Sequence, residues 1–202
     1  MVLDATWLFE RPGRKSEQWW TSLASMLLIF LARHDSSASI PLWRYEATKT
    51  KWKYERCGVF GVGDAAFSTV MVEQSLAARA FPGVPPWPTT PNLNPDILIY
   101  RPDVKRVRII ENKTERARVG RLAPYAEAAK HLRDHGWDAI LYVLISPAHP
   151  DNLIWSVVQQ YALEILFWED LLRLCDQIEC FRSLFDEDLK QYYEGPALEG
   201  DF

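Results

Sequence analysis

The pattern of apolar and polar positions predicts an alternation of helices and strands. Residues 17–33 carry apolar side chains at helical spacing, which predicts an amphipathic helix. Two short apolar runs at 97–100 and 107–110 are rich in β-branched residues and are separated by a Pro-Asp turn signal. They predict two neighbouring strands joined as a hairpin.

A helix and a buried strand are predicted after this hairpin. Residues 122–134 favour a helix that stops at Gly136. Residues 139–145 are almost all apolar, as in a strand covered on both faces within a central mixed or parallel sheet. The predicted fold class is therefore α/β, with a mixed central sheet flanked by helices. Later elements are predicted as a helix, a short strand and a helix at 153–161, 164–168 and 169–182.

The region before the hairpin has a different character. Residues 43–54 alternate aromatic and basic side chains, which favours a ribbon of half-buried strands over a platform on which bases stack. Residues 65–80 are interpreted as a helix with Glu73 in its middle. Six prolines in residues 82–95 exclude a regular element and predict an extended connection within one domain.

Length and composition predict a single domain in a chain of 202 residues, with a core at about 15–180 and an acidic extension at 183–202. Hydrophobic content of 48% and charged content of 25% are typical of soluble globular proteins. The apolar stretch 23–32 is too short to span a bilayer, and the chain does not open with a secretory signal pattern. We therefore expect no membrane partner. Three cysteines make an odd count without metal-ligand spacing, which favours the reducing cytoplasm as the location.

Charge is unevenly distributed along the chain. The net charge is −4, but residues 101–121 are rich in lysine and arginine, whereas the end of the chain is acidic. A local basic track on an acidic protein suits a nucleic-acid groove, and solvated surface charge explains the pattern nearly as well. The basic residues are Arg101, Lys105, Arg106, Arg108, Lys113, Arg116, Arg118 and Arg121.

Three charged residues are predicted to meet at the end of the strand pair. Side chains alternate along a strand, so Glu111 and Lys113 leave from one face, and Asp96 opens the partner strand. Carboxylates suit hard cations such as Mg²⁺, and a nearby ammonium can orient water or stabilise charge on a phosphate. Asn112 points to the other face, although its backbone carbonyl could also reach a metal. The alternative is a surface hairpin with an ordinary Glu–Lys pair.

These residues resemble a known family. Pro95-Asp96, followed after a hairpin by Glu111-Asn112-Lys113, resembles the PD-(D/E)xK nuclease superfamily, and the run from Ile109 to Lys113 is similar to the IENK form of a prokaryotic branch. The resemblance implies a restriction-endonuclease-like αββαβ core and a Mg²⁺-dependent endonuclease, with Mn²⁺ as a possible substitute. It implies nucleic acid as the partner, usually DNA, and a possible homodimer that cuts both strands. Asp96 and Glu111 would be metal ligands, and Lys113 the catalytic lysine.

The resemblance also proposes a third acid for the metal site. The first helix of the branch is similar to Glu17 followed by Thr21-Ser22, which implies that Glu17 points into the site. A simpler role for Glu17 is favourable interaction with the helix macrodipole. In many members of the superfamily an acid from a helix before the Pro-Asp strand completes the site, which makes Glu73 the rival of Glu17. The sequence does not choose between them.

One position departs from the family pattern. The branch carries Gln-Leu and then tyrosine after the lysine, whereas this chain has Arg121-Leu122 and Tyr125. Arg121 could bind phosphate instead, together with Arg116 and Arg118. Tyr125 is either a functional hydroxyl or a packed helix residue. The departure leaves open an inactive nuclease-fold protein that binds nucleic acid or acts as a scaffold in a prokaryotic defence or mobile-element system.

Overall fold

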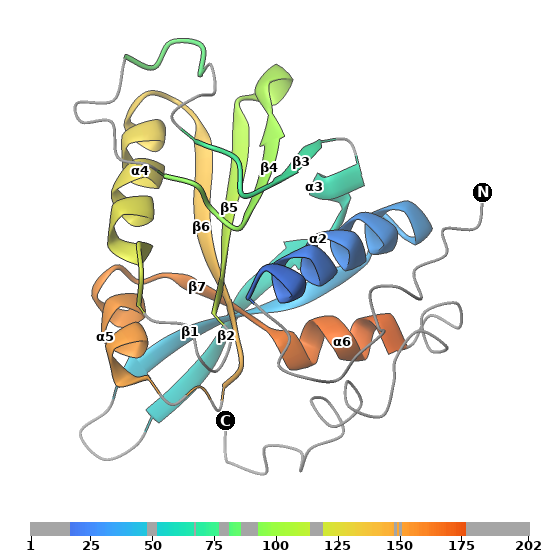
Figure 1. Ribbon diagram of the computed structural model, residues 1–202, viewed down its shortest axis with the longest axis vertical. Coiled ribbons are helices and arrows are strands. Elements are labelled where there is room, and N and C mark those ends of the chain that lie inside the picture. Colours follow the sequence, from blue (N-terminus) through green and yellow to red (C-terminus); the bar gives the residue numbers. More distant parts are fainter. Residues whose placement is uncertain are drawn as a thin grey trace.

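One sheet runs through the protein, with helices on both of its faces (Figure 1). The computed structural model describes residues 17–47, 52–66, 68–76, 81–85, 93–113, 119–147, 149 and 151–176. Within these residues the sheet has seven strands in the order β2-β1-β7-β6-β5-β4-β3. The strands are β1 (Ser39–Ala47), β2 (Trp52–Gly61), β3 (Thr69–Val72), β4 (Ile97–Arg101), β5 (Arg106–Lys113), β6 (Asp138–Ile145) and β7 (Glu164–Phe167).

The sheet is mixed. Strands β5, β6 and β7 are parallel neighbours, whereas β3, β4 and β5 pair antiparallel at one side and β1 pairs antiparallel with β2 and β7 at the other. The helices are α2 (Glu17–His34), α3 (Gly63–Ala66), α4 (Leu122–Asp134), α5 (Asn152–Gln160) and α6 (Trp168–Asp176). The predicted α/β class is therefore confirmed, and β4, β5, α4 and β6 follow one another in the predicted order.

Two hydrophobic cores lie on opposite faces of the sheet. In the first, α2 and α6 cover one face, and Ile110 of β5 packs among their leucines. In the second, α4 and α5 cover the other face, and the adjacent Ile109 packs there. Alternation along a strand explains why neighbouring residues reach different cores. Strand β6 contributes to both cores, which explains its nearly continuous apolar sequence.

The predicted hairpin is present, and β5 is longer than its apolar run. Strands β4 and β5 pair antiparallel from Ile97 opposite Ile110 to Arg101 opposite Arg106. The connection is one turn of 3-10 helix, η1 (Pro102–Val104), as proline's fixed φ favours. Lys105 then adopts a left-handed conformation with φ 49°, and its N–H donates to the Pro102 carbonyl at 3.2 Å.

The predicted helix at 65–80 is wrong. Helix α3 ends at Ala66, and residues 69–72 form β3, which pairs antiparallel with β4. The β-branched residues Thr69, Val70 and Val72 suit a strand, and the open edge of β4 supplies the backbone partners. Glu73 therefore follows a strand, is exposed, and has φ 50°.

The aromatic and basic ribbon at 43–54 packs against the sheet's second core. Tyr45 is buried, and its ring centroid lies 5.7 Å from that of Tyr54 and 5.0 Å from that of Trp155. Basic and acidic residues face one another across β1 and β2, with Arg44 opposite Glu55 and Glu46 opposite Lys53. These contacts agree with the packing interpretation.

The remaining predictions concern segments at the margins. The proline-rich connection is described only at 81–85 and 93–95, and the predicted acidic extension at 183–202 lies outside the described residues. Among the helices in the described part of the chain, none has the length and apolar character needed to cross a membrane.

Candidate active site

The structure brings Asp96, Glu111 and Lys113 to one end of the β4–β5 hairpin. Ile97 and Ile110 form the last residue pair between β4 and β5. Asp96 and Glu111 lie next to this pair, just beyond its end. Asp96 Oδ2 accepts a hydrogen bond from the backbone N–H of Asn112 at 2.7 Å. Lys113 Nζ lies 2.8 Å from Glu111 Oε1, which confirms that these two side chains share a face of β5.

The Glu111–Lys113 pair is largely removed from solvent. The two residues are 7% and 3% exposed, while Asp96 is partly exposed. Charges attract more strongly in a protein interior than in water, but removing them from water is costly. A buried acid–ammonium pair beside a second carboxylate is a concentrated electrostatic feature, of the kind that active sites use.

Helix α4 adds a hydroxyl and a guanidinium to this group. The Tyr125 hydroxyl donates to the Asn94 carbonyl at 2.7 Å. Burial raises the pKa of Tyr125, the Glu111 and Asp96 carboxylates raise it further, and Arg121 opposes them. Tyr125 is therefore electrostatically coupled to both acids and remains a neutral donor at physiological pH.

Asn112 faces the opposite side of β5, as alternation predicts. Its Oδ1 accepts from Trp168 Nε1 at 3.0 Å, and its Nδ2 donates to Thr21 Oγ1 at 3.4 Å. Asn112 and Thr21 are fully buried, and Trp168 is nearly so. Sequence reasoning missed Trp168, since a tryptophan so distant along the chain carries no local sign of this contact.

The other predicted site residues have mixed outcomes. Glu17 begins α2, but its side chain lies outside the described residues, as do Arg116 and Arg118. Glu73 is close through its backbone, since its N–H donates to the Asp96 carbonyl at 3.1 Å. Arg121 is exposed at the N-terminal end of α4.

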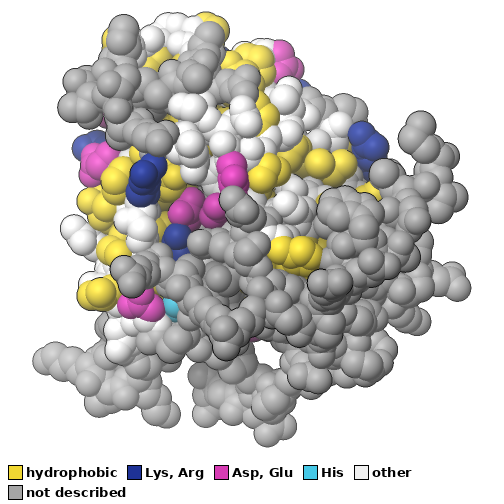
Figure 2. Space-filling view, viewed as in Figure 1, with side chains coloured by type: hydrophobic (Ala, Val, Ile, Leu, Met, Phe, Trp, Pro, Cys, Tyr) yellow, Lys and Arg dark blue, Asp and Glu magenta, His cyan; other side chains and the backbone are white. Residues whose placement is uncertain are grey.

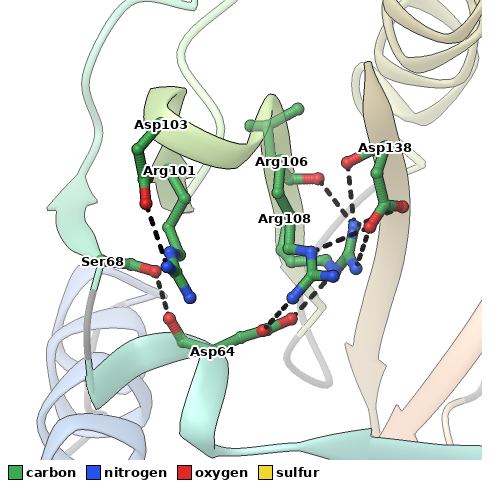
Figure 3. A network of polar contacts seen from close by, with 8 residues as sticks. Asp64, Ser68, Arg101, Asp103, Arg106, Arg108 and Asp138 are labelled. Atoms are coloured by element: carbon green, nitrogen blue, oxygen red, sulfur yellow. Dashed lines mark hydrogen bonds and ion pairs between the residues drawn. The ribbon is translucent and has the colours of Figure 1, made fainter. Parts of the chain in front are cut away.

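The predicted basic track is not continuous. Arg106 and Arg108 form ion pairs with Asp64 and Asp138 at the start of β5, away from Glu111 and Lys113 at its end (Figure 3). Arg101 pairs with Asp103 at 3.1 Å in the same region. Acidic partners thus neutralise these three arginines, which sequence counting had placed in a potential groove.

Figure 2 shows acidic and basic side chains close together near the middle of one face of the molecule. The view is that of Figure 1, in which α4 and the end of β5 lie on the visible side.

Two carboxylates of this group are candidate ligands for a hard divalent cation. Asp96 and Glu111 offer carboxylate oxygens, and Mg²⁺ is often held by one or two carboxylates together with substrate phosphate. The backbone carbonyl of Asn112 is a further oxygen on the same segment. Within the described residues, no cluster of three or more His, Cys, Asp or Glu side chains is placed to hold a metal.

Comparisons with family models, curated proteins and solved structures returned no match to this chain.

Proposed function

We propose that this protein is a metal-dependent nuclease that hydrolyses phosphodiester bonds, with DNA as its substrate. The observation that carries the proposal is the convergence of Asp96, Glu111 and Lys113 at one end of adjacent strands, with the Lys113 ammonium 2.8 Å from the Glu111 carboxylate. Two acids and a lysine in this arrangement, followed by a helix and a parallel strand, support the resemblance to the PD-(D/E)xK superfamily.

The residues of the site would have different roles in hydrolysis. Asp96 and Glu111 would hold Mg²⁺, or Mn²⁺ in its place. The bound cation would supply the positive charge that offsets charge building on the phosphate and makes water a better nucleophile. Lys113 would position the attacking water and balance negative charge as the phosphorus–oxygen bond breaks.

The surroundings of the site would hold the substrate. Arg121 offers a guanidinium at the N-terminal end of α4, where a phosphate can be bound with two donors. Arg116 and Arg118 precede it in the sequence and would extend the contact along the backbone. The neutral Tyr125 hydroxyl would orient groups beside the two acids. Such an enzyme would work in the cytoplasm, as a homodimer if both strands are cut.

A cleavage panel tests the proposal. Supercoiled, linear, single-stranded and branched DNA, and RNA, are incubated with the protein in Mg²⁺, Mn²⁺ or EDTA. We expect metal-dependent cleavage that Asp96→Ala and Lys113→Ala each reduce by about 100- to 1000-fold, because removing a single stabilising donor typically costs that much. Glu127→Ala, at an exposed position of α4, is the matched control and should retain activity. Equal cleavage by all four proteins would refute the assignment.

A second candidate is a nuclease-fold protein that binds nucleic acid or acts as a scaffold without cleaving it. The Glu111–Lys113 ion pair favours it, since this pair also satisfies both charges in a purely structural way. Binding of DNA in EDTA, combined with no product in any metal, would select this candidate.

A further inference from the structure

Strand β5 is held by buried hydrogen bonds on the face opposite Glu111 and Lys113. Asn112 lies between Glu111 and Lys113 and has no solvent exposure. Its side chain joins α6 through Trp168 and α2 through Thr21, and its backbone N–H donates to Asp96 Oδ2 at 2.7 Å. One residue thus connects a candidate metal-binding acid to two helices on the far side of the sheet.

The two side-chain bonds differ in strength. The Trp168–Asn112 bond of 3.0 Å has ordinary length, whereas the Asn112–Thr21 bond of 3.4 Å is long. Trp168 is itself held firmly, because it is 4% exposed and its ring packs against Trp20 at a centroid distance of 5.0 Å. Trp168 is therefore the stronger of the two anchors.

The geometry gives this anchor a consequence at the site. A β-strand that turned about its axis at Asn112 would move Glu111 and Lys113, which leave from the opposite face. It would also withdraw the Asn112 N–H from Asp96. A directed hydrogen bond from a rigid indole resists this turn, which an apolar contact of similar size would not.

We propose that Trp168 is a positioning residue for the candidate site, acting through Asn112 on the orientation of Asp96, Glu111 and Lys113. Its relevance to catalysis rests on the proposed nuclease function, whereas its effect on the strand does not. Partners that orient metal-binding groups typically change metal affinity or activity by about 10- to 100-fold when they are lost.

The test compares Trp168→Phe with Trp155→Phe. Each variant keeps an aromatic ring and removes one buried N–H donor. Trp155 lies on α5, and its Nε1 donates to the His149 carbonyl at 3.0 Å. The first readout is the amide signal of Asn112 in two-dimensional NMR at one pH, which reports the bond to Asp96 without metal or substrate. We expect Trp168→Phe to shift this amide proton upfield and to speed its exchange by about tenfold. Trp155→Phe should leave both unchanged.

The second readout is Mn²⁺ binding, measured as the loss of the free Mn²⁺ signal in electron paramagnetic resonance. We expect Trp168→Phe to weaken binding by about tenfold or more, and Trp155→Phe to leave it unchanged. In an Asn112→Leu background, Trp168→Phe should have little further effect, because Trp168 acts on the site through Asn112.

The outcomes separate the two ideas. An unchanged Asn112 amide in Trp168→Phe overturns the positioning role. An effect of Trp168→Phe on Mn²⁺ affinity that persists in full without Asn112 also overturns it. If the amide responds as expected but the wild-type protein neither binds Mn²⁺ nor cleaves nucleic acid, the positioning role stands and the nuclease proposal falls.

Discussion

The Lys113 ammonium lies 2.8 Å from Glu111 Oε1, and both side chains are almost fully buried. The two residues that would carry much of the chemistry are therefore also a buried ion pair within the sheet. Any loss of activity on their substitution combines a catalytic and a structural effect, which measurements of stability can separate.

Glu111→Gln and Lys113→Met should each destabilise the protein by about 3–5 kcal/mol, because each leaves one buried charge without its partner. The double variant should recover most of this loss, since the isolated charge is gone. The cleavage activity proposed for the wild type should nevertheless be absent from the double variant. Unfolding in urea gives the free energies, and a double variant no more stable than the single ones would contradict the pairing.

Arg121 should contribute to the binding of nucleic acid. Arg121→Ala should weaken DNA affinity and reduce the slope of log affinity against log salt by about 1, as expected for the loss of one phosphate contact. The matched control is Lys130→Ala, an exposed cation farther along α4. Binding measured by fluorescence anisotropy over a range of salt checks this, and identical slopes for wild type and Arg121→Ala would exclude the contact.

Tyr125 should make the protein sensitive to alkaline pH. Burial raises the pKa of this tyrosine in the folded state above its ordinary value, and the negative charges of Glu111 and Asp96 raise it further. Its contribution to stability is therefore fully present below the unfolded pKa of about 10, and it is lost as the pH rises through the folded pKa. Tyr125→Phe should flatten the decline in stability above about pH 10. Urea midpoints on either side of that pH measure the effect, and parallel curves would contradict it.

The ion pairs at the start of β5 should matter for stability and not for cleavage. Asp138→Asn removes the carboxylate charge and one of the two oxygens that accept from the nearly buried Arg108, but Asp138 is half exposed and Asp64 remains as a partner. We expect a loss of about 1 kcal/mol with unchanged activity per folded molecule. The control Asp103→Asn breaks an exposed pair and should cost less.

Acid should weaken the same network. A hydrogen bond from Arg108 lowers the pKa of Asp138 below its ordinary value. The stabilisation is present above the unfolded pKa of about 4 and is lost as the pH falls through the lower folded pKa. Asp138→Asn should therefore reduce the loss of stability in acid. Urea midpoints of the two proteins between about pH 5 and pH 2 test this, and an equal loss in both would contradict it.

Sequence alone determined the features that depend on short spacing. Helical periodicity predicted α2, and a helix ending before Gly136 was predicted at the position of α4. The continuous apolar run predicted β6, and the Pro-Asp signal predicted the hairpin. Alternation along β5 was enough to place Glu111 and Lys113 on one face and Asn112 on the other. These properties follow from backbone geometry within a few residues, so they can be predicted locally.

Tertiary structure alone decided which distant residues meet. Residues 69–72 form a strand because the edge of β4 offers backbone partners. Glu73 therefore lies at the end of a strand and not within the predicted helix. Arg106 and Arg108 look like part of a basic track in the sequence, but Asp64 and Asp138 are brought beside them by the fold. Trp168 reaches Asn112 in the same way. Strand register and the packing of helices on the sheet set these contacts, and neither is determined by local sequence spacing.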